Sequence, residues 1–147
     1  MRLRQPILLL LLSCTLAAQS AFAQSPPVPV TPASATWFSP PNNPLLRAAW
    51  MLGAEKQAGA YLLRVVLSEG GRIAPHTHPD ARVVTVLDGT LFVAFGAKPG
   101  DADMVPVSAG SVYVVPANMA HALWAKEGDV TYQETGIGPT GNSPIGK

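Results

Sequence analysis

Two histidines separated by a single residue are the clearest candidates for chemistry in this chain. His76 and His78 occur in GGRIAPHTHPDARVVTVLDG, and the third histidine, His121, follows in VPANMAHALW. In an extended chain residues i and i+2 project to the same face, so His76 and His78 can reach one point in space. Pro75 and Pro79 flank the pair, and proline favours extended backbone for the residue before it.

Three imidazoles brought together on a β scaffold form a plausible site for a divalent metal ion. Such a set leaves coordination positions open for water or substrate, which suits catalysis better than structural zinc. We therefore predict that His76, His78 and His121 hold one ion, which can be Fe, Mn, Ni, Cu or Zn. Because ligation needs neutral imidazole, we expect the affinity to fall as the pH drops through about 6. The alternative is a polar pocket of hydrogen-bonded histidines without metal.

The segment that holds the histidine pair resembles the first motif of the cupin superfamily, G-x5-H-x-H-x3,4-E-x6-G. Gly70, His76, His78 and Gly89 match this motif at the right spacings. The motif's glutamate falls on Arg82, so that ligand is missing from this chain.

A second segment is similar to the second cupin motif, G-x5-P-x-G-x2-H-x3-N. Gly110, Pro116 and His121 match, whereas Asn118 stands at the middle glycine and Ala125 at the final asparagine. Asparagine tolerates positive φ better than most residues, so Asn118 can keep the turn that glycine makes in the motif.

The resemblance implies an all-β fold, a small jelly-roll β-barrel with both motifs on facing strands and their histidines in the barrel mouth. The pattern of short β-branched and apolar runs between turn signals predicts about eight antiparallel strands within residues 48–136, as a single domain. We expect no helix and no second domain. Cupins include dioxygenases, isomerases, hydrolases, storage proteins and sugar-binding domains, so the resemblance does not select one reaction.

Three polar residues near the histidines are candidates for the pocket. A guanidinium about 6 Å from a divalent ion is repelled by about 5 kcal/mol at an effective dielectric of about 20. Arg82 therefore points outward, pairs with an acid, or marks a metal-free site; it can also grip an anionic substrate. Asp80 is either a substitute ligand or a solvent-facing turn residue. Gln133, on the last strand, is expected to face the cavity.

The ends of the chain have distinct compositions. Residues 1–23 have the charged start, apolar core and Ala-Phe-Ala site of a signal peptide cleaved after Ala23, which predicts a periplasmic or secreted protein. A lipoprotein signal ending at Cys14, the chain's single cysteine, is the alternative. Residues 24–47 are rich in proline and are expected to form a strap or linker, and residues 137–147 an irregular Gly/Pro-rich tail.

Composition excludes some partners and leaves others open. Charged residues make up 13% of the chain and the net charge is +1, with no basic run, so nucleic acid and acidic membrane surfaces are not expected partners. We expect a small-molecule ligand or substrate, with a homodimer as an alternative to a monomer. The function hypotheses are a metal-dependent enzyme, with an oxygenase as one option, a non-catalytic binding or sensor cupin, and a structural protein with a relic site.

Overall fold

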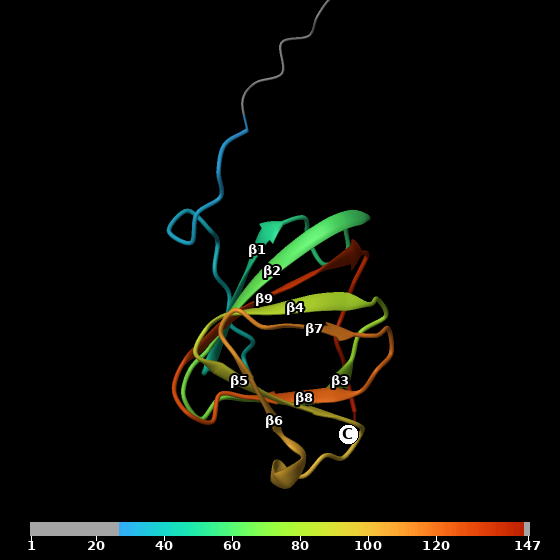
Figure 1. Ribbon diagram of the computed structural model, residues 1–147. Helices are drawn as coiled ribbons and strands as arrows, with labels where there is room; N and C mark the ends of the chain where they lie inside the picture. The colour runs from blue at the N-terminus through green and yellow to red at the C-terminus, as the bar shows by residue number, and fades with distance from the viewer. Residues whose placement is uncertain (1–26, 146–147) are drawn as a thin grey trace, which may run out of the picture.

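Two five-stranded antiparallel sheets face each other and enclose the core (Figure 1). The structure is a computed structural model that describes residues 27–145. One sheet has the order β1-β2-β9-β4-β7 and the other the order β10-β3-β8-β5-β6. The strands are β1 (Leu46–Leu52), β2 (Gly59–Leu67), β3 (Arg72–Thr77), β4 (Arg82–Asp88), β5 (Thr90–Phe95), β6 (Val105–Ser108), β7 (Val112–Val115), β8 (His121–Trp124), β9 (Val130–Gly138) and β10 (Ser143–Pro144). This all-β jelly-roll architecture confirms the predicted fold class.

Alternation along the strands decides which side chains enter the core. On β9, Val130, Tyr132 and Glu134 are buried, whereas Thr131 and Gln133 between them are only partly buried. Successive residues of a strand point to opposite faces, so the buried set is the one that faces the second sheet. The core is rich in valine, leucine and alanine, as expected for two packed sheets.

The two sheets contain more strand residues than the sequence pattern predicts. The histidine segment is itself a strand, β3, which pairs with β8. Strand β9 continues to Gly138, and β10, in the segment expected to be an irregular tail, pairs with β3. These additions rest on pairing between distant segments, which hydrophobic periodicity within one segment does not reveal.

The later part of the proline-rich segment, from Trp37 on, contacts the barrel. Phe38 and Ala48 form an isolated β-bridge, and the side-chain amide of Asn43 donates to the Arg72 carbonyl at 2.9 Å. The Arg47 guanidinium lies 4.7 Å from the centre of the Trp37 ring. The segment thus contacts both its own first strand and the start of β3.

Within residues 27–145 the one helical element is a single 3₁₀ turn, Asp101–Asp103. In the same range we find no helix that is long and apolar enough to cross a membrane. The predicted signal peptide, residues 1–23, lies outside the described residues.

Candidate metal site

The two sequence motifs bring the three histidines together. His76 lies on β3 and His121 at the start of β8, and the two are direct cross-strand partners. Their ring centres are 4.3 Å apart, and those of His76 and His78 are 4.7 Å apart. One ring nitrogen from each histidine lies within 4.8 Å of the other two, and all three residues are buried. Spacing in the sequence therefore predicted this convergence.

The turn between β7 and β8 connects the two motifs directly. Asn118 has a φ of 60°, the positive value expected from its place at the motif's glycine. Its backbone N–H donates to the His78 carbonyl at 2.7 Å. The turn that leads into His121 is therefore fastened to the segment that carries His78.

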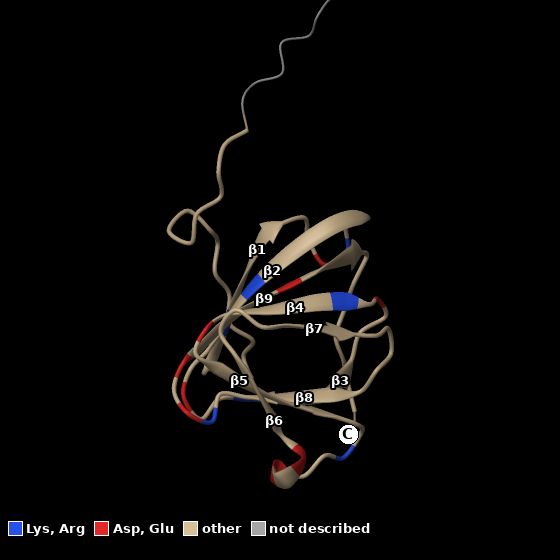
Figure 2. Cartoon of the chain, viewed as in Figure 1, with Lys and Arg blue, Asp and Glu red and all other residues tan. Residues whose placement is uncertain are grey.

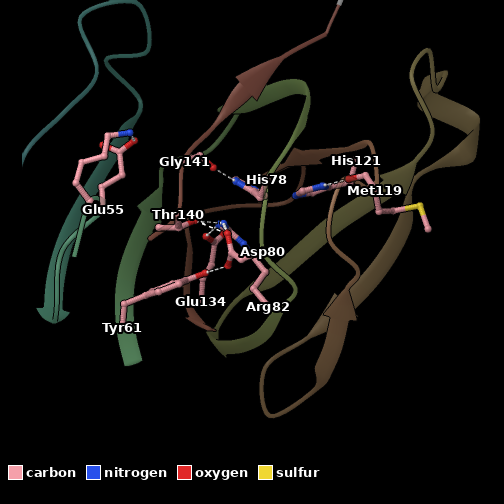
Figure 3. A network of polar contacts seen from close by, with 11 residues as sticks. Glu55, Tyr61, His78, Asp80, Arg82, Met119, His121, Glu134, Thr140 and Gly141 are labelled. Carbon is pink, nitrogen blue, oxygen red and sulfur yellow. Dashed lines mark hydrogen bonds and ion pairs between the residues drawn. The ribbon is translucent and has the colours of Figure 1, made fainter. Parts of the chain in front are cut away.

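Backbone carbonyls fix the orientation of all three imidazoles. Figure 3 shows these contacts for His78 and His121. A carbonyl only accepts, so each Nδ1 carries the proton and each Nε2 keeps a free lone pair. The Nε2 atom of His78 is buried and has no hydrogen-bond partner among the described residues. A buried nitrogen without a partner is costly, and a metal ion would satisfy it. The acceptors are the carbonyls of Ala74 for His76 at 2.8 Å, Gly141 for His78 at 2.6 Å and Met119 for His121 at 3.1 Å.

Burial also keeps the three rings neutral. It lowers the pKa of His76 and of His78 to about 4, and it lowers the pKa of His121 as well. Neutral imidazole is the form that binds a metal, so all three side chains are ready to act as ligands at neutral pH. The donor set therefore fits a divalent ion.

Arg82 points into the barrel, which corrects the expectation of an outward orientation. Its side chain is 3% exposed, and Nη1 donates to Oε2 of Glu134 at 2.5 Å. Nη2 donates to Oδ1 of Asp80 at 2.9 Å and to Oγ1 of Thr140 at 2.7 Å. Figure 2 shows a basic position on β4 and an acidic position on β9, the neighbouring strand of the same sheet. Of the alternatives for Arg82, pairing with an acid is the one that the geometry supports.

Asp80 belongs to this ion-pair network and lies outside the histidine cluster. The Tyr61 hydroxyl donates to its Oδ2 at 2.5 Å, and the Thr140 hydroxyl donates to its Oδ1 at 2.5 Å. Burial favours the neutral acid, but these hydrogen bonds and the Arg82 charge offset it and hold the pKa of Asp80 below its ordinary value. Asp80 is thus an acceptor for its neighbours, and is neither a metal ligand nor a solvent-facing turn residue in this geometry.

The cavity-facing residue on β9 is Glu134 and not Gln133. The Gln133 side chain lies on the outer face of the sheet, where its oxygen accepts a hydrogen bond from Arg64 at 3.0 Å. The strand alternates, so the neighbour of an outward residue faces inward. Counting by twos from the apolar Val130 and Tyr132 would have identified Glu134 from the sequence.

The C-terminal segment forms one wall of the site. Gly141 supplies the carbonyl that orients His78, and the Thr140 hydroxyl enters the Arg82 network. The Thr140 backbone N–H donates to Glu55 at 2.8 Å, and that of Ile145 donates to Pro75 at 2.9 Å. The sequence does not reveal this role, because Gly and Pro in a terminal segment usually indicate irregular structure.

A cavity of about 700 Å³ opens beside the histidines. His76 and His78 line it together with Arg82 and Glu134, and most of the remaining wall is apolar. Both terminal segments contribute, through Phe38 and Pro40 from the proline-rich segment and through Pro144 and Ile145 from the C-terminal segment. This size and lining are typical of a small-molecule site.

Curated relatives resemble part of this chain. Germin-like protein 1-1 of Oryza sativa subsp. japonica is 36% identical over 64 residues, which are 43% of this chain and 30% of that protein. Germin-like protein subfamily 1 member 7 of Arabidopsis thaliana is 36% identical over 67 residues, 43% of this chain and 29% of that protein. The chain thus spans less than a third of the length of these relatives.

Solved structures share the fold at low sequence identity. The polyketide cyclase RemF from Streptomyces resistomycificus aligns with a TM-score of 0.67 and 13% identity, over 80% of this chain and 84% of that chain. KdgF from Halomonas sp. aligns with a TM-score of 0.59 and 17% identity, over 73% of this chain and 91% of that chain. A salicylate 1,2-dioxygenase from Pseudoaminobacter salicylatoxidans, in complex with gentisate, aligns with a TM-score of 0.58 and 16% identity. The alignment covers 71% of this chain and 30% of that chain.

The family model described as Cupin matches residues 22–146, which is most of the chain. The match includes both histidine motifs and all ten strands of the described barrel. This protein therefore belongs to the cupin family.

Proposed function

We propose that this protein is an exported cupin in which His76, His78 and His121 bind one divalent ion, and that it acts as a metal-dependent enzyme on a small organic molecule in the adjoining cavity. The observation that carries this proposal is the common arrangement of the three rings, each held through Nδ1 by a carbonyl, with ring nitrogens within 4.8 Å of one another. A bound ion would supply Lewis-acid chemistry and orient a ligand at its open positions.

The protein's own residues supply orientation and a controlled environment. The carbonyl contacts hold the rings in one tautomer, and burial keeps them unprotonated. The apolar walls of the cavity exclude water from a bound molecule, which strengthens polar interactions at its few polar points. Structural neighbours named as a cyclase and a dioxygenase support an enzyme of this kind.

A non-catalytic binding or sensor protein is the second candidate. The observation that favours it is Arg82 at the position of the motif's glutamate, which removes a carboxylate from the set of ligands. Metal-loaded protein should be assayed for oxygen consumption and for product formation against a panel of small organic compounds. Turnover that is lost in His76→Ala supports the enzyme, whereas saturable binding without turnover supports the sensor.

Export is part of the proposal and rests on residues 1–23. The charged start, the apolar run and the Ala-Phe-Ala site together support cleavage after Ala23 and a periplasmic or secreted location. The intact mass of the exported protein should then begin at Gln24. A lipid-modified Cys14 at the N-terminus would contradict this part of the proposal.

A homodimer is also proposed, on the basis of the edge strand β7. Val112 and Val114 on this strand are 58% and 59% exposed. An exposed apolar edge strand is commonly covered by a partner. Light scattering of the purified protein should give twice the monomer mass, and a monomer at all concentrations would contradict the dimer.

A further inference from the structure

Glu134 has one carboxylate oxygen that its protein neighbours leave free. Its side chain is 6% exposed, and Oε2 accepts the hydrogen bond from Arg82. Among the described residues none donates to Oε1, although Glu134 lines the cavity. A buried carboxylate oxygen that lines a cavity without a donor is a strong acceptor for whatever occupies that cavity.

Arg82, by contrast, directs three of its five N–H donors at protein neighbours. Nη1 is engaged by Glu134, and Nη2 is engaged by Asp80 and Thr140. Its Nε is buried and has no hydrogen-bond partner among the described residues. Two carboxylates surround this one guanidinium, so the network carries a net charge of about −1 when both are ionised. The sequence-based idea that Arg82 grips an anionic substrate is therefore not supported, because an anion at this end of the cavity would meet excess negative charge.

The position of Glu134 relative to the histidines suits contact through a ligand. Its carboxylate is not part of the cluster of nitrogens within 4.8 Å. Glu134 lines the same cavity as His76 and His78, so the carboxylate and these rings border one ligand space. A molecule bound beside the histidines would thus lie next to Oε1.

We propose that Glu134 is a specificity-determining residue, whose free oxygen selects uncharged, largely apolar molecules that carry a hydroxyl group, such as an alcohol or a phenol. This inference rests on the proposed function, because it assigns the class of ligand to the same cavity. The ligand's hydroxyl donates a hydrogen bond to Oε1 of Glu134, and its apolar part packs against the cavity walls. A carbonyl compound of the same shape places a second acceptor against Oε1, so no hydrogen bond forms. Leaving a buried polar group without a partner costs enough to change affinity about tenfold.

The test compares two probes of almost the same shape, 1-phenylethanol and acetophenone, by saturation-transfer NMR titration of the full mature chain. The wild-type protein should bind the alcohol about tenfold more tightly than the ketone. In Glu134→Gln the amide oxygen must face the Arg82 donor, so the NH₂ group faces the cavity. This variant should reverse the order and bind the ketone more tightly.

Gln133→Ala is the matched control, since its side chain lies on the outer face of the same strand. It should keep the wild-type order of the two probes. The wild-type comparison needs no variant, so it tests the inference even if Glu134→Gln fails to fold. Equal affinities in the wild type, or a preference for the ketone, would overturn the inference.

Metal content measured on the same samples separates the two proposals. Metal bound without a preference for the alcohol overturns the role of Glu134 and leaves the metal site intact. A preference for the alcohol in protein that binds no metal supports the role of Glu134 and overturns the metal-dependent function.

Discussion

Arg82 and Glu134 form a buried ion pair across adjacent strands, with Nη1 of Arg82 2.5 Å from Oε2 of Glu134. In the cupin motif that this chain resembles, the position of Arg82 carries a glutamate. Here an arginine occupies it, and acidic partners stand at Glu134 on the next strand and at Asp80. A cation at this position is compatible with a metal site because its charge is neutralised within the network.

Removing this cation should destabilise the fold. Arg82→Met leaves two buried carboxylates without their counter-ion, which should lower the free energy of unfolding by about 3–5 kcal/mol. Urea denaturation measures this change. The double variant Arg82→Met/Glu134→Leu should recover much of the loss, because it removes a buried charge together with its partner. Wild-type stability in the single variant would contradict the account of the pair.

Asn118 should respond to substitution according to its positive φ. Asn118→Gly should be neutral or mildly stabilising, whereas Asn118→Val should cost about 1 kcal/mol or more, since a β-branched residue fits this conformation poorly. Ala117→Val, at the neighbouring exposed position, is the control and should have little effect. Thermal or urea unfolding of the three variants measures these changes. Equal stability of the glycine and valine variants would contradict a positive φ at position 118.

Metal affinity should fall at a lower pH than the value of about 6 that the sequence predicts. Burial lowers the pKa of His76 and His78 to about 4 from the ordinary 6.5. Protons compete with metal only where the folded, metal-free rings take them up, so affinity should be nearly constant from about pH 8 to about pH 5 and fall below that. Metal titrations across this range measure it. A steep loss centred near pH 6 would show that the rings are not buried as described.

The lowered pKa values of His76 and His78 also determine how the stability of the metal-free protein changes with pH. Between about pH 4 and 6.5 the unfolded chain binds more protons at these histidines than the folded chain does. The metal-free protein should therefore lose stability as the pH falls through this window. Bound metal should shift the loss to lower pH, because it holds the rings unprotonated.

The C-terminal segment should contribute to metal affinity through the Gly141 carbonyl. Deleting residues 139–147 removes the acceptor that orients His78, as well as β10, and should weaken metal binding by about 10–100-fold. Deleting only residues 146 and 147 is the control and should leave the affinity unchanged. Wild-type affinity in the longer deletion would show that His78 is oriented by other contacts.

The histidines were predictable from the sequence, and the groups that support them were not. An i, i+2 pair on extended backbone and a third histidine after a turn are local features that spacing reveals. Glu134, Thr140 and Gly141 reach the site only through pairing between β4 and β9 and through the C-terminal segment folding back. Such contacts depend on register and tertiary packing. The expectation that Gln133 faces the cavity is wrong by one residue, because the alternation from Val130 and Tyr132 buries Glu134.

The most direct test of the central claim is the metal stoichiometry of the purified protein. The protein is dialysed at neutral pH against Mn, Fe, Ni, Cu and Zn in turn, and bound metal is measured by elemental analysis. We expect one ion per chain in the wild type and in Gln133→Ala. Metal affinity should fall strongly in each of His76→Ala, His78→Ala and His121→Ala. Circular dichroism should show that all variants are folded. Wild-type protein that stays metal-free against all five ions would contradict the metal site and remove the main support for the proposed enzyme.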